Sequence, residues 1–206
     1  MLYNKSYKRS MHMPPKPRIT KEMIVEEAFQ IARTEGADKI TARRVSENLK
    51  CSTQPVLYYF SAVEEIRAAV FQKADEYHTR FLMNEEHDYG DPILAMGMNY
   101  IRFALEERNL FHFLFQSNEY SGDSLIDLVQ SEEIKPIIQV MKQEAEMTEE
   151  EVKEIFTTLF VFVHGYASLF ANNEMVYDEE FLVTSLTKVF DGAVYAAREV
   201  TNEEDL

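Results

Sequence analysis

The chain has 206 residues, of which 46% are hydrophobic, and its formal net charge at pH 7 is −15. This length and apolar content exclude a disordered chain and predict one large folded domain or two small ones. The single cysteine, Cys51, excludes an internal disulfide bond and a cysteine-based zinc site, and the first residues show no apolar signal-peptide core. Both features predict a cytoplasmic protein.

The charge is distributed unevenly along the chain. Residues 1–60 hold 11 Lys/Arg and 6 Asp/Glu, a net of +5, whereas residues 61–206 hold 10 and 30, a net of −20. A basic N-terminal part attracts a polyanion while the acidic remainder is repelled from it, which would orient the molecule on its partner. Unevenly distributed solvating charge is the alternative interpretation of the same numbers.

The first 17 residues are predicted to form a flexible basic arm. They contain three prolines and four basic side chains but no apolar period. Met11 and Met13 could each begin translation in place of Met1.

Four helices are predicted between residues 20 and 85. The first begins at Thr20 as N-cap and stops at Gly36. Thr41 caps a short second helix, 41–49, and Ser52 caps a third, 52–59. Ser61 and Glu64 form a capping box for a long fourth helix. One apolar stripe of that helix consists of Val63, Ile66, Val70, Ala74, Tyr77 and Phe81.

A break at His87–Pro92 precedes the remaining helices, with Asp91 as cap and Pro92 in the first helical position. Helices are predicted near 92–107, 109–117, 123–146, 148–173 and 178–199. Pro136 interrupts the third of these, and Thr148 with Glu151 forms a capping box for the fourth. No segment alternates with period two for long enough to predict a strand, so the predicted fold is all-α.

One segment, residues 155–173, approaches the ~20 apolar residues that a membrane span needs. It contains no Asp, Glu, Lys or Arg. Polar residues interrupt it, however, and acidic residues flank it instead of a Lys/Arg cluster. We therefore expect a helix buried on all sides in a soluble protein and no association with a membrane.

The stretch "CSTQPVLYYFSAVEE", residues 51–65, carries the functional prediction. Helices 41–49 and 52–59, joined by Lys50 and Cys51, have the lengths and the tight turn of a helix-turn-helix. In that motif the second helix enters the DNA major groove by its N-terminal turn, where short hydroxyl and amide side chains reach base edges. Side chains of this kind open the third helix at Ser52, Thr53 and Gln54. One side of Leu57, Tyr58 and Phe60 is predicted to anchor the helix to the others.

The same residues also resemble a family. "RITKEMIVEEAF", "EGADKITARRVSENL" and "STQPVLYYFSAVEEI" are similar to the N-terminal domain of tetracycline-repressor-type (TetR/AcrR) regulators. "FVHGYASLFANNEM" resembles the penultimate helix of one branch. The resemblance implies a three-helix DNA-binding domain over residues 18–66, a long connector helix, and a helical ligand-binding and dimerisation domain over 67–206. The chain departs from the family at Lys50, where a glycine is usual, and at Val63, where a lysine is usual.

The resemblance also implies roles for single residues at the DNA. Residues on the phosphate backbone would be Thr41, Arg43, Arg44, Tyr58 and Tyr59, with Lys50 as a further phosphate contact. Residues facing bases would be Ser52, Thr53, Gln54 and Pro55. Arg18 and the arm before it would reach a neighbouring groove.

The last two predicted helices are apolar on more than one face, which favours burial against a second chain. Small residues that would allow close approach are Gly165, Gly192, Ala196 and Ala197. The resemblance implies a two-fold homodimer with a four-helix interface. Such a dimer reads two half-sites ~34 Å apart on double-stranded DNA, which predicts a palindromic operator.

Helices 92–146 are rich in methionine and aromatic residues, where the resemblance implies an effector pocket. Candidate residues for an unknown apolar small molecule are Tyr100, Phe103, Phe115, Met141 and His164. An ordinary core is the alternative interpretation of these side chains, and His112 and His164 also fit as core histidines. The glutamates at 149–151 fit a helix N-terminus. We expect neither a metal nor a cofactor.

The prediction is a sequence-specific DNA-binding transcriptional regulator, a ligand-responsive repressor. One rival is a helical dimeric small-molecule carrier or interaction module with a vestigial DNA-binding motif. An enzyme is disfavoured because the sequence holds no Gly-rich phosphate loop, no His-Glu-x-x-His motif and no nucleophile elbow. Cys51, the only thiol, fits a small buried hydrophobe better than a nucleophile.

Overall fold

The structure is a computed structural model, and it describes residues 19–84, 89–117 and 147–204 together with 135, 138, 139, 141 and 142. The described residues form helices and contain no strand, which confirms the all-α prediction. The predicted arm, Arg18 and most of the helix predicted at 123–146 lie outside them.

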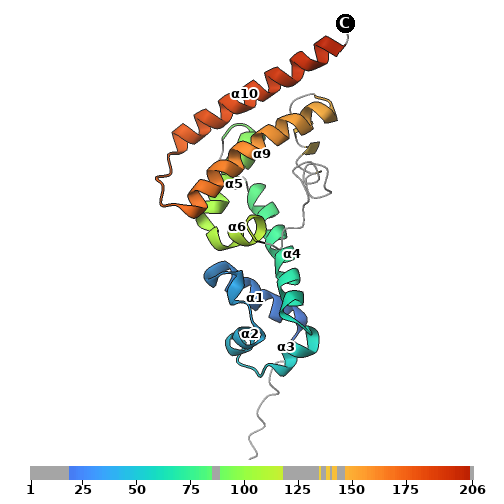
Figure 1. Cartoon of the computed structure of the whole chain (residues 1–206), viewed down its shortest axis with the longest axis vertical. Helices are drawn as coiled ribbons and strands as arrows, with labels where there is room; N and C mark the ends of the chain where they lie inside the picture. Colours follow the sequence, from blue (N-terminus) through green and yellow to red (C-terminus); the bar gives the residue numbers. More distant parts are fainter. Residues whose placement is uncertain are drawn as a thin grey trace, which may run out of the picture.

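Three short helices form one end of the molecule (Figure 1). They are α1 (Lys21–Glu35), α2 (Ala42–Asn48) and α3 (Gln54–Tyr59), with the 3₁₀ turn η1 (Ala37–Lys39) between the first two. Thr20 Oγ1 accepts a hydrogen bond from the Met23 amide at 3.3 Å, and Gly36 ends α1 with φ 104°, a conformation that favours glycine. Both predicted signals of α1 are therefore confirmed.

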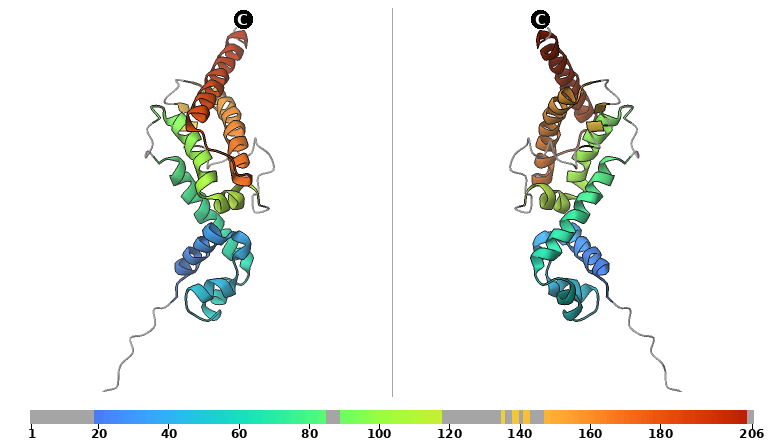
Figure 2. Two further views of the ribbon diagram at one scale, coloured as in Figure 1. Left: turned by 90° about the vertical axis from the view of Figure 1, so that its left-hand side faces the viewer. Right: turned by 90° about the vertical axis from the view of Figure 1, so that its right-hand side faces the viewer.

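The long helix α4 (Val63–Leu82) leads from this end to the larger helical part (Figure 1). That part consists of α5 (Pro92–Glu106), α6 (Arg108–Phe115), α9 (Glu149–Asn172) and α10 (Glu179–Glu204). The two turned views show α9 and α10 side by side (Figure 2). Asp91 Oδ1 accepts from the amides of Ile93 and Leu94, both at 2.8 Å, which confirms the predicted cap of α5.

The predicted capping box of α9 is also present. Thr148 Oγ1 accepts from the Glu151 amide at 3.3 Å, while the Thr148 amide donates to Glu151 Oε2 at 2.8 Å. Gly97 lies where α5 packs on α9 and α10. A Cβ atom there would lie 2.6 Å from Leu186 Cδ2 and 3.4 Å from Val163 Cγ1, so a larger residue would require the Leu186 side chain to move.

Two predicted caps in the N-terminal part are wrong. The N-cap of α3 is Thr53, not Ser52, and its side chain makes no capping hydrogen bond. Ser61 pairs with Glu65, not Glu64: its amide and its hydroxyl donate to the two carboxylate oxygens of Glu65, each at 2.8 Å. The reason is the helix register. Because α4 begins at Val63, residue 65 stands at the third helical position, from which a carboxylate reaches back over the helix start.

A partly buried ion pair joins the two parts of the molecule. Arg33 of α1 donates from Nε to Glu107 Oε2 at 2.7 Å and also pairs with Oε1. Tyr77 of α4 donates its hydroxyl to Glu107 Oε1 at 2.8 Å, and Asn109 Nδ2 donates to the Arg33 carbonyl at 3.0 Å. Glu107 is only 6% exposed, between α5 and α6. These contacts connect α1 to the larger helical part through charge-assisted hydrogen bonds.

Among the described helices, α9 alone is long and apolar enough to cross a membrane, by length and composition only. In the apolar window 39% of the residues are buried inside the chain, against α5 and α10. The sequence predicted a helix buried on all sides, and this prediction is wrong for the single chain.

Candidate nucleic-acid interface and effector site

The turn between α2 and α3 is closed by two backbone hydrogen bonds and places Lys50 in a left-handed conformation. The Lys50 amide donates to the Glu47 carbonyl at 3.1 Å and the Cys51 amide to the Ser46 carbonyl at 3.0 Å. Lys50 has φ 53°, and among the described non-glycine residues no other has a positive φ. A side chain in this left-handed conformation costs roughly 1 kcal/mol, which explains why glycine suits this position.

The polar residues of the predicted reading helix lie on the surface. Ser52, Thr53 and Gln54 are exposed, and Pro55 is half-buried in the first turn of α3. Leu57 is 54% and Tyr58 is 79% exposed. These residues therefore form one exposed face at the outer end of the molecule. We call Ser52, Thr53, Gln54, Leu57 and Tyr58 the reading face.

The anchor of α3 differs from the prediction. Phe60 is buried as predicted, but Leu57 and Tyr58 are exposed, and the second buried anchor is Val56, with Tyr59 half-buried beside them. A helix starting after Thr53 places residues 56, 59 and 60 on one side and 57 and 58 on the other. The exposed Leu57 was missed as a candidate contact, although an apolar side chain on this face can meet a thymine methyl group.

The two predicted phosphate-binding arginines both have carboxylate partners in the free protein. Arg43 is 85% exposed and donates from Nε to Glu47 at 2.8 Å, and Arg44 donates from Nη2 to Glu35 at 2.7 Å. In each case the hydrogen bond to the carboxylate raises the pKa of the guanidinium. Surface ion pairs of this kind are weak, so a phosphate can replace the carboxylate.

Two further predicted contacts lie beside them. Thr41 uses its hydroxyl to cap α2, where it accepts from the Arg44 amide at 3.0 Å. Lys50 is exposed, and no ion pair involves it in the described part of the chain. The fixed positive charge that remains available in the turn is therefore that of Lys50.

The excess of basic residues in the N-terminal part comes from a short segment of the sequence. Residues 19–60 hold six Lys/Arg and six Asp/Glu, and residues 1–18 hold five Lys/Arg and no acidic residue. The whole net charge of +5 in residues 1–60 therefore comes from the first 18 residues. The helices that carry the reading face are neutral as a group, and long-range attraction of a polyanion depends on the residues before them.

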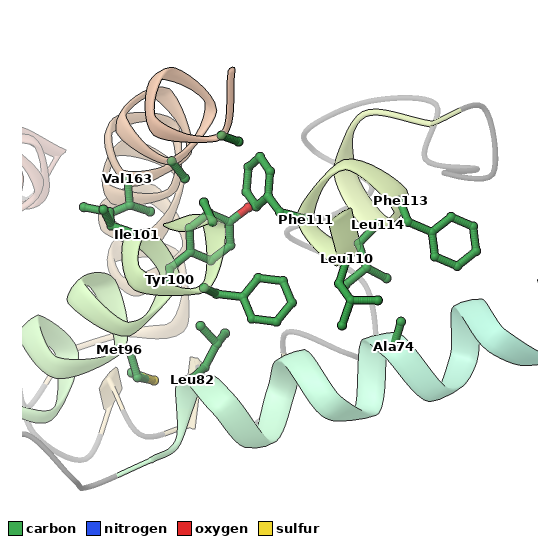
Figure 3. Close-up of a cluster of buried hydrophobic side chains, with 14 of the residues drawn as sticks. Ala74, Leu82, Met96, Tyr100, Ile101, Leu110, Phe111, Phe113, Leu114 and Val163 are labelled. Carbon is green, nitrogen blue, oxygen red and sulfur yellow. The ribbon is translucent and has the colours of Figure 1, made fainter. Parts of the chain in front are cut away.

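An aromatic cluster lies where α4, α5, α6 and α9 meet, and Figure 3 shows two of its members, Tyr100 and Phe111, close together. Tyr100 of α5 hydrogen bonds through its hydroxyl to His164 Nδ1 of α9 at 2.9 Å. Phe103 and Phe115 belong to the same cluster, so four of the five predicted effector residues come together. The fifth, Met141, is also buried in the core.

The sequence reasoning missed the residue at the centre of this cluster, His78 of α4. Its ring centroid lies 5.4 Å from that of Tyr100, 4.7 Å from Phe103 and 5.1 Å from Phe115. Its Nε2 atom is buried, and none of the described residues forms a hydrogen bond with it. Burial lowers the pKa of His78 to about 3 and also lowers the pKa of His164, so both rings are neutral near pH 7. The helical spacing could have predicted its burial, because residue 78 follows residues 66, 70 and 74 on the buried side of α4.

A second apolar surface lies on α9 and α10. Large exposed side chains are Val161 and Leu169 of α9 and Phe181 and Tyr195 of α10. Gly165 and Gly192 are exposed, and a Cβ atom at either would meet no atom within 4 Å. Ala196 is exposed as well, but Ala197 is buried inside its own chain, so it is not available to a partner. We call Val161, Gly165 and Leu169, which follow at intervals of four, the α9 outer face.

Two smaller predictions concern chemistry. Cys51 is half-buried in the turn, a partial match to the expected small hydrophobe. The described residues include no group of three His, Cys, Asp or Glu side chains that could hold a metal ion.

Residues 93–190 match the family model of the tetracyclin repressor-like C-terminal domain. Among solved structures, a tetR-family transcriptional regulator from Streptomyces coelicolor is similar with a TM-score of 0.66 and 14% sequence identity, over 88% of this chain and 83% of that chain. The multidrug binding protein EbrR, solved in complex with ethidium, is similar with a TM-score of 0.51 and 14% identity, over 85% of this chain and 99% of that chain. No curated protein sequence matches the chain.

Proposed function

We propose that this chain is a transcriptional regulator of the tetracycline-repressor type, a ligand-responsive repressor that binds a palindromic operator as a homodimer. The observation that carries the proposal is the reading face. A helix of the DNA-contacting motif here exposes hydroxyl, amide and apolar groups together at the end of the molecule that lies farthest from the acidic helices. It is not expected to be an enzyme, and it would act in the cytoplasm.

On DNA, α3 would lie in the major groove with its first turn toward the bases. Gln54 would read a base edge through its amide, with Ser52, Thr53 and Pro55 beside it, and Leu57 would contact a thymine methyl group. Contacts to phosphates would come from Thr41, Arg43, Arg44, Lys50, Tyr58 and Tyr59. Arg18 and the basic residues before it would add charge in a neighbouring groove.

A dimer is required because one such motif covers only one half-site. The α9 outer face and the exposed residues of α10 support a four-helix interface between two copies. Gly165 and Gly192 have open space above them within the chain, and that space suits the close approach of a partner helix. Exposed apolar residues of this size, grouped on two adjacent helices, favour burial against a second protein surface.

The effector would bind at the aromatic cluster and act on the separation of the two reading faces. The cluster includes residues of α4 and α6, and both helices pack against α1. The ion pair of Arg33 with Glu107 connects the same regions. A displacement of a few ångström against a ~34 Å spacing would prevent both α3 helices from docking together.

A carrier with a vestigial DNA-binding motif remains the second candidate, favoured by the neutral charge of residues 19–60. A salt titration separates the two. The full-length protein is used to select fragments from random DNA, and the affinity for the selected sequence is measured from low to high salt. We expect a palindrome and a steep loss of affinity, with a slope of about −0.9 for each phosphate contacted. Absence of DNA binding at low salt would rule out the regulator.

A further inference from the structure

His78 has an unsatisfied polar atom in the centre of the aromatic cluster. The residue is only 7% exposed, and Nε2 has no hydrogen-bond partner among the residues that the structure describes. A buried nitrogen without a partner is costly, and such groups are rare in folded proteins. A leucine or phenylalanine would fill the same place on the apolar stripe of α4 without that cost. A hydrogen-bonding ligand would remove the cost.

The rings around His78 come from different helices and meet it edge-on. The planes of Tyr100, Phe103 and Phe115 are inclined to the imidazole by 82°, 68° and 72°. Tyr100 and Phe103 are buried, whereas Phe115, in the last turn of α6, is partly exposed. Rings arranged in this way favour contact with another ring, and Phe115 is the side chain that an entering molecule would displace.

The charges nearby indicate what the molecule can carry. Both imidazoles of the cluster are neutral because burial lowers the pKa of His78 and of His164. The rings in contact with His78 belong to the uncharged residues Tyr100, Phe103 and Phe115, and the Glu107 carboxylate already pairs with Arg33 and Tyr77. A charged ligand group placed here would be buried without a partner.

We propose that the cluster binds an uncharged ring molecule whose hydroxyl group forms a hydrogen bond with His78 Nε2. A hydroxyl suits this position because it can donate or accept, and so it satisfies either tautomer of the imidazole. The inference rests on the proposed function, since the molecule would be the effector. In addition to the proposed function, the inference specifies the chemical class of the ligand and names His78 as the residue that distinguishes it from similar molecules.

The test compares two probes that differ by one hydroxyl, 1-naphthol and naphthalene, with ethidium as a cationic ring. Binding to the full-length protein is measured by titration calorimetry without DNA. We expect 1-naphthol to bind about tenfold more tightly than naphthalene, and ethidium to bind most weakly. His78→Leu should abolish the preference for the hydroxyl, and His78→Gln should retain part of it. The control is His112→Leu, because His112 hydrogen bonds to Gln116 on the outer side of α6.

Three results would overturn the inference: equal affinity for the two neutral probes, tighter binding of ethidium, or no binding of any probe. If His78→Leu fails to fold, the NMR resonances of the histidine rings are followed in the wild-type protein instead. An unchanged His78 resonance at saturating 1-naphthol would refute the assignment. Operator binding is measured on the same preparation. DNA binding without naphthol binding defeats only this inference, whereas naphthol binding without DNA binding defeats the proposed regulator.

Discussion

At the scale of single residues, Lys50 combines two demands that oppose each other. Its backbone is left-handed, with φ 53°, where a side chain is unfavourable. Its ammonium group, however, is exposed beside the reading face and has no carboxylate partner in the described part of the chain. A strained residue at a proposed DNA contact is expected if binding is favoured here at the expense of stability.

We therefore predict that Lys50→Gly raises the free energy of unfolding by about 0.5–1 kcal/mol, measured by urea denaturation. The same variant should reduce the salt slope of operator binding by about 1 because one phosphate contact is lost. Lys50→Ala is the matched control: it retains the Cβ atom and should lower the salt slope without raising stability. A stabilised Lys50→Ala would contradict the explanation by strain.

Gln54 and Arg43 should affect DNA binding in different ways. Gln54→Ala should relax the preference at one base position by about 1–3 kcal/mol, while Arg43→Ala should weaken binding to all sequences alike. Competition between the operator and single-base variants measures both effects. If Arg43→Ala changes the base preference and Gln54→Ala does not, the assigned roles are reversed.

His78 should make the protein sensitive to acid. An imidazole in the unfolded chain titrates near pH 6.5, whereas burial lowers the pKa of native His78 to about 3. Between these values the unfolded chain binds a proton that the native ring does not, so stability falls as the pH falls, by up to about 1.4 kcal/mol per pH unit. Above pH 6.5 this group adds no pH dependence.

Replacement of His78 by phenylalanine should remove this contribution. Urea unfolding at pH 7.5, 6.0 and 5.0 should show a smaller loss of stability in His78→Phe than in the wild-type protein. Part of the acid sensitivity should persist, because burial also lowers the pKa of His164. Parallel pH curves for the two proteins would show that native His78 has the same pKa as in the unfolded chain, which would contradict the effect of burial.

At the scale of elements, the contact between α1 and the α5–α6 junction depends on one carboxylate. Glu107 accepts hydrogen bonds from Arg33 of α1 and Tyr77 of α4, two helices that are far apart in the sequence. Its low exposure, 6%, means that water cannot replace those donors if the charge is removed. The relative position of the part that carries the reading face and the larger helical part is therefore sensitive to this residue.

Glu107→Gln should lower the free energy of unfolding by about 2 kcal/mol. This value lies below that of a fully buried pair because the Arg33 side chain is 38% exposed. Glu106→Gln is the control, since Glu106 pairs with Arg102 one turn away on an exposed surface and should change stability by less than about 0.5 kcal/mol. Equal effects of the two substitutions in urea denaturation would show that the Glu107 network contributes little.

At the scale of the whole molecule, one chain leaves apolar surface exposed that a dimer would cover. Val161 on the α9 outer face is 56% exposed, although it lies in a helix with no Asp, Glu, Lys or Arg between residues 155 and 173. Two different contacts would then explain why α9 is so apolar. One side packs against α5 and α10 of its own chain, and the other side is available to a partner.

Val161→Glu should convert the dimer to a monomer, measured by sedimentation equilibrium, because two carboxylates would be buried at the two-fold interface. Operator affinity should fall with it. The control is Met83→Glu, since Met83 is also an exposed apolar residue but lies at the end of α4. If the wild-type protein is a monomer at working concentrations, the proposed assembly is wrong.

The sequence alone determined the features that depend on neighbouring residues. Caps at Thr20, Thr41, Asp91 and Thr148 are present because a cap side chain bonds two or three residues further along. The all-α fold, the turn at Lys50 and the polar start of α3 were predictable for the same reason. Four of the five effector candidates also lie together, since aromatic content marked their helices.

Only the tertiary structure decided which side of each helix is covered. Val56, not Leu57, anchors α3, because the start of the helix at Thr53 turns one face toward α1. The pairing of Arg33 with Glu107 joins residues 74 positions apart, and rings from other helices surround His78 Nε2, which has no partner in the described part of the chain. Such contacts depend on how helices pack, and a period of 3.6 residues does not specify which neighbour a face will meet.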